Sequence, residues 1–551
     1  MLTILLNWLY VFCITFVLGL GLAAMSNRLF GYRMKDIDSL VMAGLGISTV
    51  YAQIFSLFTG VGILANIILI VICVAIMCVC RKEINDYLKN LIKECKVTRW
   101  IILAVLVILW SYFTSRGYMH YDSDLYHAQS IRWIEEYGVV PGLGNLHERF
   151  AYNSSFFALS ALYSMKFLLG ESLHGMSGFF ALVLSCTALG ITKSWRNKKF
   201  GISDYGRIAA IYYLTTIIDE VVSPASDYSI MCVILFIVIK WLDLLEAEEK
   251  NTAPYALLCV LGVYALTIKL TAGLIILLVI KPVISLIKEK KYRDIILYFS
   301  MGLLTAIPWF IRTVMISGWL IYPFPALDLF HFDWEMNAAK IEIDAAQITT
   351  WGRALYNVSL VDLPPTQWIP NWFMTTLSGM EKVLILGCCI AILIFVMDVV
   401  YTLCKKEWKR LDVLLVYAVV ISSYLFWQFS APLLRYGYAY VLLLDFVILG
   451  GVLIRLGWNK VQNIAYFILI AYGLYKVYAM GQYISGNYLQ EYYVWQADYG
   501  VYEMESYEID DVTLYCPVQG DRTGYEYFPA TPIKMDIELR GEGLKDGFRC
   551  P

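Results

Sequence analysis

Three cations lie in or beside apolar stretches at widely separated positions of the chain. Lys269 interrupts the apolar run at residues 255–280, Arg312 follows a Pro-Trp pair, and Arg435 lies in a short turn. A charge in hydrocarbon costs several kcal/mol, so such residues usually serve a partner or a task. Cations that meet at headgroup depth would suit a phosphate, which arginine binds in bidentate fashion. The alternative is three unrelated side chains that snorkel to the interface or form ion pairs.

The acidic candidates lie in the stretch YDSDLYH at residues 121–127. Asp122 and Tyr126 are one helical turn apart, so both can face one cleft, where a carboxylate could act as a general base. Asp124 lies two residues further along the same stretch. The alternative is that both aspartates only cap a helix that is expected to run to about Tyr137. Asp227, in another predicted outer turn, is a further acidic candidate.

Three of the five histidines, His120, His127 and His147, fall in the same segment. A metal site built from them would need a geometry that spacing does not show, and the alternative is solvated or hydrogen-bonded histidine. The chain has no CxxC pair with zinc spacing, which argues against a structural zinc site.

The composition is that of a polytopic helical membrane protein, because 59% of the 551 residues are hydrophobic and only 16% are charged. A net charge of −2 argues against a nucleic-acid partner. The first apolar run has no basic leader and no small-residue cleavage site, so we expect a retained span. About 14 spans are predicted, at 3–24, 38–57, 60–80, 99–114, 174–192, 206–222, 229–245, 254–268, 270–287, 294–316, 380–403, 411–429, 436–455 and 461–480.

Lysine and arginine gather in four of the connecting loops, near residues 81–99, 193–199, 288–293 and 405–410, and these loops should be cytoplasmic. The run 154–169 is therefore expected to be interfacial or re-entrant, and the run 254–287 to be two short spans that break near 267–271. Both termini and three long segments, about 115–173, about 317–379 and the tail from about 485, are then placed outside. Lys269 would face an outward-opening cavity.

The tail from Gly486 has 13 acidic and 5 basic residues, with a strand-like stretch at 511–516 and turn signals at Gly520 and Gly541. We expect a small module docked on the other outer segments. A disulfide between Cys516 and Cys550 is one option for it. Five tryptophans of the second outer segment, Trp319, Trp334, Trp351, Trp368 and Trp372, are expected to divide between an interfacial belt and surfaces for sugar rings.

Several of these features together resemble the GT-C class of integral-membrane glycosyltransferases. They are a long first outer loop that opens with an acid, a Pro-Trp-x-x-Arg…Ser-Gly-x-x-x-Tyr-Pro stretch before the second loop, and a late Arg-Tyr pair. More closely, the chain resembles an uncharacterised bacterial family with the pattern D-x-x-x-Y-H…W…V-P-G-L…N-x-H-x-R. Here the pattern begins at Asp122 and ends at Arg149, and the likeness extends to Phe332-Asp333-Trp334 and to the last residues of the chain.

The resemblance implies an all-α, GT-C-like transmembrane domain at 1–484 and an extracytoplasmic α/β module at 485–551, in the bacterial inner membrane. GT-C enzymes transfer a sugar from a polyprenyl-phosphate donor to a glycan or lipid acceptor at the outer face, typically with inversion. The base would be Asp122, with Asp124 as the second choice because relatives often carry glycine at its position. Lys269, Arg312 and Arg435 would bind the lipid phosphate. The other expected pocket residues are Tyr126, His127, Arg132, His147, Arg149, Asp227, Trp319, Asp333, Trp334 and Tyr436. Some members use a divalent metal, Mg²⁺ or Mn²⁺, but no acidic cluster here demands one.

Two further functions stay open at this point. A glycan polymerase or ligase of the same fold would use the same cations. A transporter or flippase of lipid-linked sugars would place ionisable residues through the bilayer midplane and carry an internal repeat. The candidate charges gather at one face and no clear repeat is visible, so the sequence favours an enzyme.

Overall fold

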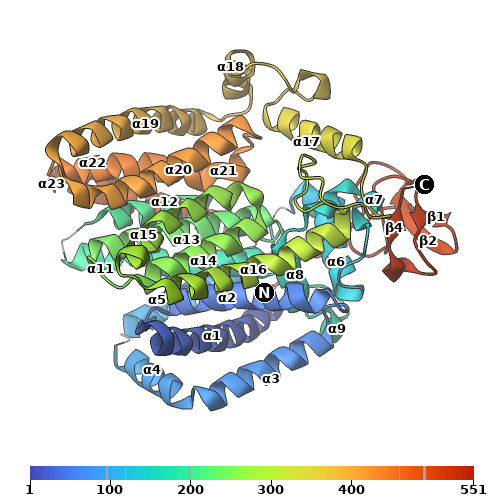
Figure 1. Ribbon diagram of the computed structural model, residues 1–551, viewed down its shortest axis with the longest axis horizontal. Helices are drawn as coiled ribbons and strands as arrows, with labels where there is room; N and C mark the ends of the chain where they lie inside the picture. Colours follow the sequence, from blue (N-terminus) through green and yellow to red (C-terminus); the bar gives the residue numbers. More distant parts are fainter. Residues whose placement is uncertain (95–96, 118, 198–199, 458, 488–491, 551) are drawn as a thin grey trace.

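A bundle of long helices forms the body of the protein (Figure 1). The computed structural model describes residues 1–94, 97–117, 119–197, 200–457, 459–487 and 492–550. The first helices are α1 (Leu2–Phe30), α2 (Ile37–Ser56), α3 (Ile63–Val79), α4 (Arg81–Glu94) and α5 (Val97–Ser115). The central helices are α10 (Met176–Ala188), α11 (Ile191–Asn197), α12 (Ile202–Thr216), α13 (Ser226–Glu246), α14 (Ala253–Ile268), η3 (Leu270–Val279), α15 (Ile280–Lys288) and α16 (Tyr292–Ser317).

The last helices of the bundle follow a long connection. They are α19 (Gly379–Lys405), η5 (Trp408–Arg410), α20 (Leu411–Phe429), α21 (Leu434–Leu443), η6 (Leu444–Ile448), α22 (Leu449–Arg455) and α23 (Asn459–Asn487). Each predicted apolar run contains helix, although the run at 206–222 is helical only as far as Thr216. Among the described residues, nine helices are long and apolar enough to cross a membrane, or ten if the bent pair at α3 and α4 is one span. A multi-pass membrane protein is thus supported, while the count of 14 remains a prediction.

The break predicted near residues 267–271 is confirmed. α14 ends at Ile268, Lys269 is extended with φ −156° and ψ 131°, and the 3₁₀-helix η3 starts at Leu270. The run at 154–169, which was predicted to be interfacial or re-entrant, forms two short helices, α8 (Ser155–Tyr163) and α9 (Lys166–Leu169). All nine residues of α8 are buried, so this helix packs inside the bundle and does not lie on a lipid surface.

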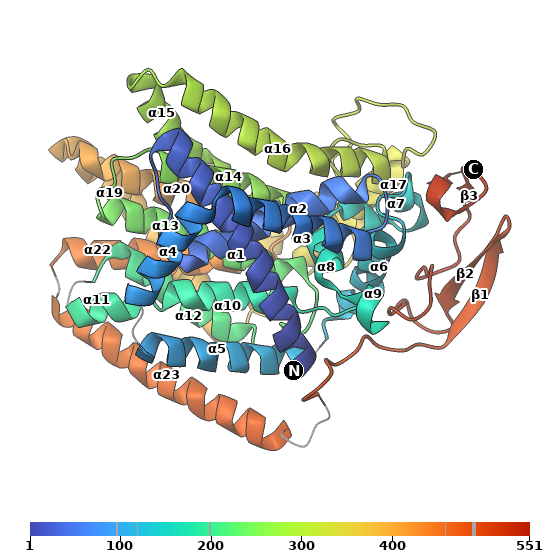
Figure 2. The same ribbon diagram turned by 90° about the horizontal axis from the view of Figure 1, so that it is seen from below.

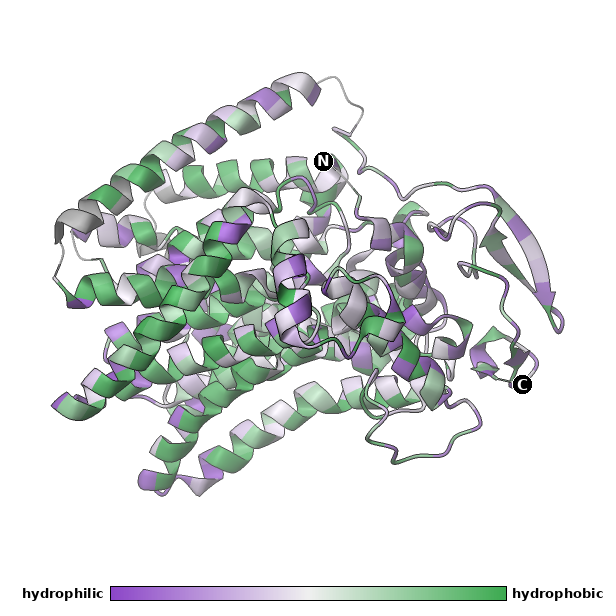
Figure 3. Cartoon of the chain, turned by 90° about the horizontal axis from the view of Figure 1, so that it is seen from above, coloured by the Kyte–Doolittle hydropathy of each residue, from purple (hydrophilic) through white to green (hydrophobic). Residues whose placement is uncertain are grey.

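The basic turns and the long segments lie at opposite ends of the bundle. Figures 1 and 2 show α4, α11, α15 and α22 at the left end, where the basic turns lie, and α6, α7, α17 and the strands at the right end. Lys96, Lys198 and Lys199 of the basic turns lie outside the described residues. Figure 3 shows hydrophobic residues along the helices and many hydrophilic ones over the segments at the far end. This segregation agrees with the predicted grouping of the outer segments.

The outer segments and the tail pack together. The first segment forms η1 (Ser123–His127), α6 (Ala128–Glu136), α7 (Leu143–Leu146) and η2 (Glu148–Tyr152), and the second forms α17 (Ala338–Gly352), η4 (Val358–Leu360) and α18 (Pro365–Thr375). The tail forms two antiparallel pairs, β1 (Met504–Ile509) with β2 (Val512–Pro517) and β3 (Glu538–Leu539) with β4 (Phe548–Arg549), and the turn η7 (Leu544–Asp546). Trp133, Trp319, Leu514 and Phe548 share one apolar cluster, so the predicted docking of the tail is confirmed.

The tail contains no disulfide between its two cysteines. Cys516 and Cys550 are both free thiols. The Cys516 thiol faces Glu505 across the hairpin, and the Cys550 thiol faces Asn145 of the first outer segment, at 3.2 Å from its Oδ1 atom. The module is therefore held by packing and by hydrogen bonds to the outer segments.

Candidate functional site

Two carboxylates and two cations alternate at the end of the bundle that carries the long connecting segments. Arg435 Nη2 lies 2.7 Å from Asp122 Oδ2, and its Nε lies 3.3 Å from Asp227 Oδ2. The other oxygen of Asp227 pairs with the ammonium of Lys269. These four residues, named the charge cluster below, come from four segments of the chain. Lys269 and Arg435, two of the three cations expected to act together, therefore lie close to each other. Asp227 pairs with both of them, and Asp122 pairs with Arg435.

Each member of the charge cluster sits at the end of an element. Asp122 directly precedes η1, Asp227 is in the first turn of α13, and Arg435 is in the first turn of α21. Lys269 occupies the break after α14, which is fixed by the hydrogen bond that Ser154 Oγ donates to the carbonyl of Ile268 at 2.8 Å. Positions at helix ends let side chains of different helices converge at one depth.

The ring of Tyr436 packs against both cations of the charge cluster. The Lys269 ammonium lies 3.3 Å from the centroid of its ring, and the Arg435 guanidinium carbon lies 5.1 Å from it. Arg435 also donates to the phenol oxygen at 3.2 Å. A ring face attracts cations that have lost part of their water, so Tyr436 helps to hold both charges together.

His120 belongs to the same group, although the sequence singled it out only as a metal candidate. Its Nδ1 accepts the backbone N–H of Asp122 at 3.1 Å and lies 3.6 Å from Asp122 Oδ2, and its ring contacts Arg435. Burial and the Arg435 guanidinium lower the pKa of His120, so its imidazole is neutral near pH 7. The sequence signal that could have indicated this role is the position of His120, two residues before Asp122.

Asp122 is an ionised and reachable carboxylate. Burial alone would raise its pKa, but the charge of Arg435, with smaller contributions from His127 and His120, holds that pKa below its ordinary value. The side chains of Asp122, Lys269 and Arg435 are 22%, 22% and 27% exposed, so a ligand can reach them. Asp122 makes no capping hydrogen bond to its helix, which argues against a role limited to capping.

Tyr126 and His127 lie behind Asp122. The two rings meet edge to face with centroids 4.4 Å apart, and the His127 ring also contacts Phe157. Burial lowers the pKa of His127 to about 3, so the imidazole stays neutral. Burial and the negative charge of Asp122 raise the pKa of Tyr126 far above its usual range. Both residues therefore support the site as neutral, packed groups.

Asp124 faces away from the charge cluster and holds the tail. Its carboxylate accepts the Gly500 N–H at 3.0 Å and the Tyr502 hydroxyl at 2.8 Å, and its carbonyl accepts the Thr523 N–H at 2.9 Å. Arg132 likewise donates to the carbonyls of Tyr525 and Glu526. These two expected site residues are thus engaged by the C-terminal module.

Arg312 lies apart from the two other cations. Its side chain is 2% exposed and donates to Asn153 Oδ1 at 3.1 Å and to Ser56 Oγ. The next residues of that loop, Ser154 and Ser155, bond to Ile268 and Thr267, immediately before Lys269. Arg312 therefore braces the loop that fixes the Lys269 backbone.

The other expected pocket residues make contacts within and between the long segments and the tail, away from the charge cluster. Arg149 pairs with Asp344 of α17 at 3.2 Å, and His147 pairs with its neighbour Glu148 at 3.4 Å. The Trp319 indole donates to the carbonyl of Met336 at 2.9 Å. The Trp334 indole donates to the Val314 carbonyl at 3.1 Å and lies under the Arg540 guanidinium, which pairs with Asp333 at 2.8 Å.

The tryptophans expected to face sugars or lipid headgroups are mostly enclosed. Trp319, Trp368 and Trp372 are at most 4% exposed, whereas Trp351 is 61% exposed. An enclosed indole can stack on neither a sugar nor a headgroup. Trp351 is thus the one of these four that is placed to meet a ligand.

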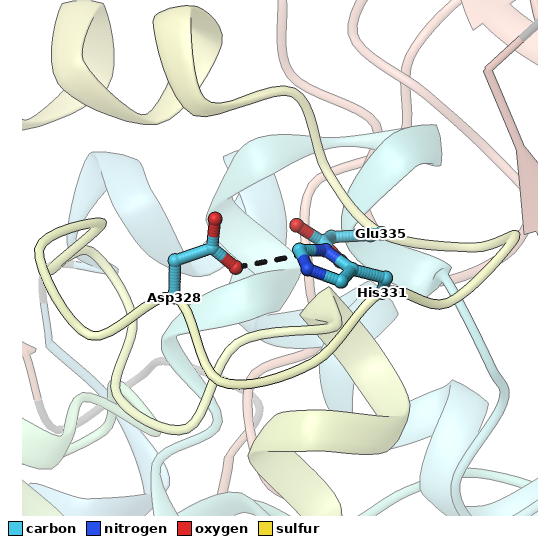
Figure 4. Close-up of side chains that lie close together, drawn as sticks. All are labelled: Asp328, His331 and Glu335. Atoms are coloured by element: carbon cyan, nitrogen blue, oxygen red, sulfur yellow. Dashed lines mark ion pairs between the residues drawn. The ribbon is translucent and has the colours of Figure 1, made fainter.

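A separate group of possible metal ligands lies in the loop between α16 and α17. One ligand atom each of Asp328, His331 and Glu335 lies within 4.8 Å of the others. Figure 4 shows Asp328 and His331 facing each other, with 3.9 Å between Asp328 Oδ1 and His331 Nδ1. The His331 side chain is 86% exposed, so water competes with any ion here.

Residues 1–442 match a family that is described as a domain of unknown function, DUF8201, and the chain belongs to that family. The match includes the whole charge cluster and ends before the C-terminal module. Neither the curated proteins nor the solved structures contain a match to this chain.

Proposed function

We propose that this protein is a GT-C-type glycosyltransferase that moves a sugar from a polyprenyl-phosphate donor to a glycan or lipid acceptor of the cell envelope. The observation that carries the proposal is the charge cluster, in which one ionised, accessible carboxylate lies beside two accessible cations. A lipid phosphate leaving group needs cations and an attacking hydroxyl needs a base, and the cluster offers both within one contact network.

In this proposal Asp122 accepts the proton of the acceptor hydroxyl as its oxygen attacks the anomeric carbon of the donor sugar. The bond between that carbon and the phosphate oxygen breaks, and its electron pair leaves with the polyprenyl phosphate. Lys269 and Arg435 stabilise the negative charge that collects there. Attack from the face opposite the phosphate gives inversion.

The resting cluster sets a condition for this reaction. Both cations are already paired with Asp227, whose side chain is only 10% exposed. The donor phosphate must therefore take over contacts that Asp227 makes in the free protein. Asp227 keeps the cations in place between turnovers and is a competitor of the phosphate.

The orientation follows from charge. The turns rich in lysine and arginine lie at the opposite end of the bundle from the charge cluster (Figure 1). By the positive-inside rule, this arrangement supports our proposal that the cluster faces the extracytoplasmic side of a bacterial inner membrane, which the chain is proposed to cross about 14 times.

The test is sugar transfer by the purified protein in lipid nanodiscs, with a panel of labelled polyprenyl-phosphate sugars and a crude envelope acceptor. Asp122→Asn keeps the shape of the side chain and removes the base, so transfer or donor hydrolysis should fall by a factor of 10² to 10⁴, on the order of what a general base contributes. Asp511→Asn, at an exposed position of the tail, is the matched control.

One result would favour the alternative functions. In that result there is no turnover, and donor binding survives Asp122→Asn but is lost in Lys269→Ala. The cluster would then bind lipid-linked sugars without acting as a transferase site, as in a glycan ligase or a flippase.

A further inference from the structure

The end of the bundle that carries the basic turns contains a cavity of about 1080 Å³. It lies between the start of α2, the region from α10 to α12 and the end of α13. Within the described ranges, five acidic and four basic residues line it. Carboxylates and cations thus share one wall, which differs from the purely cationic lining that a simple anion would favour.

A second cavity, of about 530 Å³, runs from this one along the bundle between α1, α2, α14 and α16. The two cavities share Asp36, Lys240 and Asp243. In the described part of the chain these three are the charged residues of the second cavity, and most of its remaining lining is apolar. Lining residues such as Met25 and Leu304 are 41% and 65% exposed, so this apolar groove opens on the surface that faces lipid.

We propose that the two cavities together bind one phospholipid with a zwitterionic headgroup. The headgroup lies in the charged cavity and an acyl chain lies in the apolar groove. The site is separate from the charge cluster at the other end of the bundle and does not depend on the proposed transferase activity.

The lining accounts for both charges of such a headgroup. Lys240 Nζ lies 2.9 Å from Asp36 Oδ2 and 2.9 and 3.0 Å from the two carboxylate oxygens of Asp38, so its hydrogens are engaged. The phosphate would instead be met by Lys193 and Arg196, which line the same cavity. The Asp36 side chain is 66% exposed at the rim, and a carboxylate can accept further hydrogen bonds, so it can also receive a lipid ammonium. A lipid with both charges gains both contacts, and one with only a phosphate gains the first alone.

The length of the groove suits a chain from the leaflet on this side. Gly46 lines the groove and lies ten residues beyond Asp36, at about 15 Å along α2. That is about half of the hydrocarbon thickness of a bilayer, which is the depth of one leaflet. A side chain at position 46 would therefore occupy the inner end of the chain site.

Gly46 is also a suitable position for a substitution that blocks the groove. A Cβ built there meets its nearest neighbour, the Tyr264 ring, at 3.7 Å, which is ordinary contact, so a leucine can extend into the groove. Gly302 of α16 is a matched control, since a Cβ there also meets its nearest neighbour at 3.7 Å and the residue does not line the groove.

The experiment uses the full chain, purified in detergent and stripped of lipid. Phosphatidylethanolamine and phosphatidylglycerol with identical chains are added separately, and binding is followed by native mass spectrometry and by the melting temperature. We expect a one-to-one complex with phosphatidylethanolamine, at least tenfold tighter than with phosphatidylglycerol. Gly46→Leu should weaken it at least tenfold, and Gly302→Leu should bind like the native chain.

A second variant keeps the test decisive if Gly46→Leu does not fold. Asp36→Asn removes the rim carboxylate and should reduce the preference for phosphatidylethanolamine over phosphatidylglycerol by at least fivefold. The proposal is overturned if phosphatidylglycerol binds as tightly to the native chain, if neither lipid binds, or if Gly46→Leu and Gly302→Leu behave alike.

Discussion

Removing the carboxylate of Asp227 should make the charge cluster bind a lipid phosphate more tightly. In the native chain the cluster has two negative and two positive members, and Asp227 pairs with both cations. Asp227→Asn leaves a net charge of +1, keeps the shape of the side chain and removes the group that competes with the phosphate. This prediction is counterintuitive, because the loss of a residue from the site improves binding.

The magnitude can be worked from the Arg435–Asp227 pair. At 3.3 Å and an effective dielectric constant of about 20, the attraction is about 5 kcal/mol before desolvation. Measured couplings of close charge pairs extend down to about 1.5 kcal/mol. Even this lower value corresponds to about a tenfold change in a dissociation constant. We therefore expect at least tenfold tighter binding of a lipid phosphate.

The assay is a titration of the protein in nanodiscs with a short-chain prenyl phosphate, at low and at high salt. The gain should shrink at high salt, because salt screens partly exposed charges. Asp219→Asn, an exposed aspartate in the turn before α13, serves as the matched control. Unchanged or weaker phosphate binding by a correctly folded Asp227→Asn chain would refute the reasoning, since Asp227 would then organise the cations without competing for them.

Four further outcomes follow from the same contacts. Arg435→Gln should reduce both donor binding and transfer, because it leaves Asp122 without its strongest partner; a native pH profile in that variant would contradict this. The pKa of Asp122 is below its ordinary value, so its ion pair contributes stability above about pH 4 that is lost as the pH falls further; melting curves of the native chain and Asp122→Asn should converge in acid. Trp133→Ala should cost about 3–5 kcal/mol because this side chain is fully buried under the tail, and limited proteolysis should then cut the tail sooner. His331→Ala should abolish any binding of Mn²⁺ or Zn²⁺ that calorimetry detects, whereas retained binding would place the ion elsewhere.

The depth of the site could be read from the sequence, but the pairing of its residues could not. The break at Lys269 was predictable because the turns on both sides of residues 254–287 are expected on the cytoplasmic side, which demands two crossings. The pattern of apolar runs also predicted that Arg312 lies near the outer membrane boundary. It did not show that the Arg312 side chain points to Asn153 and Ser56, because the direction of a side chain within a bundle depends on which helices become neighbours.

Asp124 illustrates the same limit on a local scale. Asp122 and Asp124 are two residues apart at the start of one helix. They are the same residue type and have similar neighbours in the sequence. Residues two apart point to nearly opposite sides of a helix, so the two carboxylates diverge, one toward Arg435 and the other toward Gly500 and Tyr502. Residues about 375 positions downstream thus decide which of two neighbouring acids joins the cluster.

The spacing of the cluster along the chain has a consequence for biosynthesis. Asp227 and Lys269 are 42 residues apart and lie on the adjacent helices α13 and α14, so they can pair as soon as this hairpin has been made. Paired charges are much cheaper to insert into a membrane than a lone ammonium. Asp122 must wait for Arg435, which is 313 residues later. A chain truncated before Arg435 would therefore contain a stably inserted hairpin whose Lys269–Asp227 pair is neutral, but its charge cluster would be incomplete. A cell could retain or degrade such a chain before it becomes active.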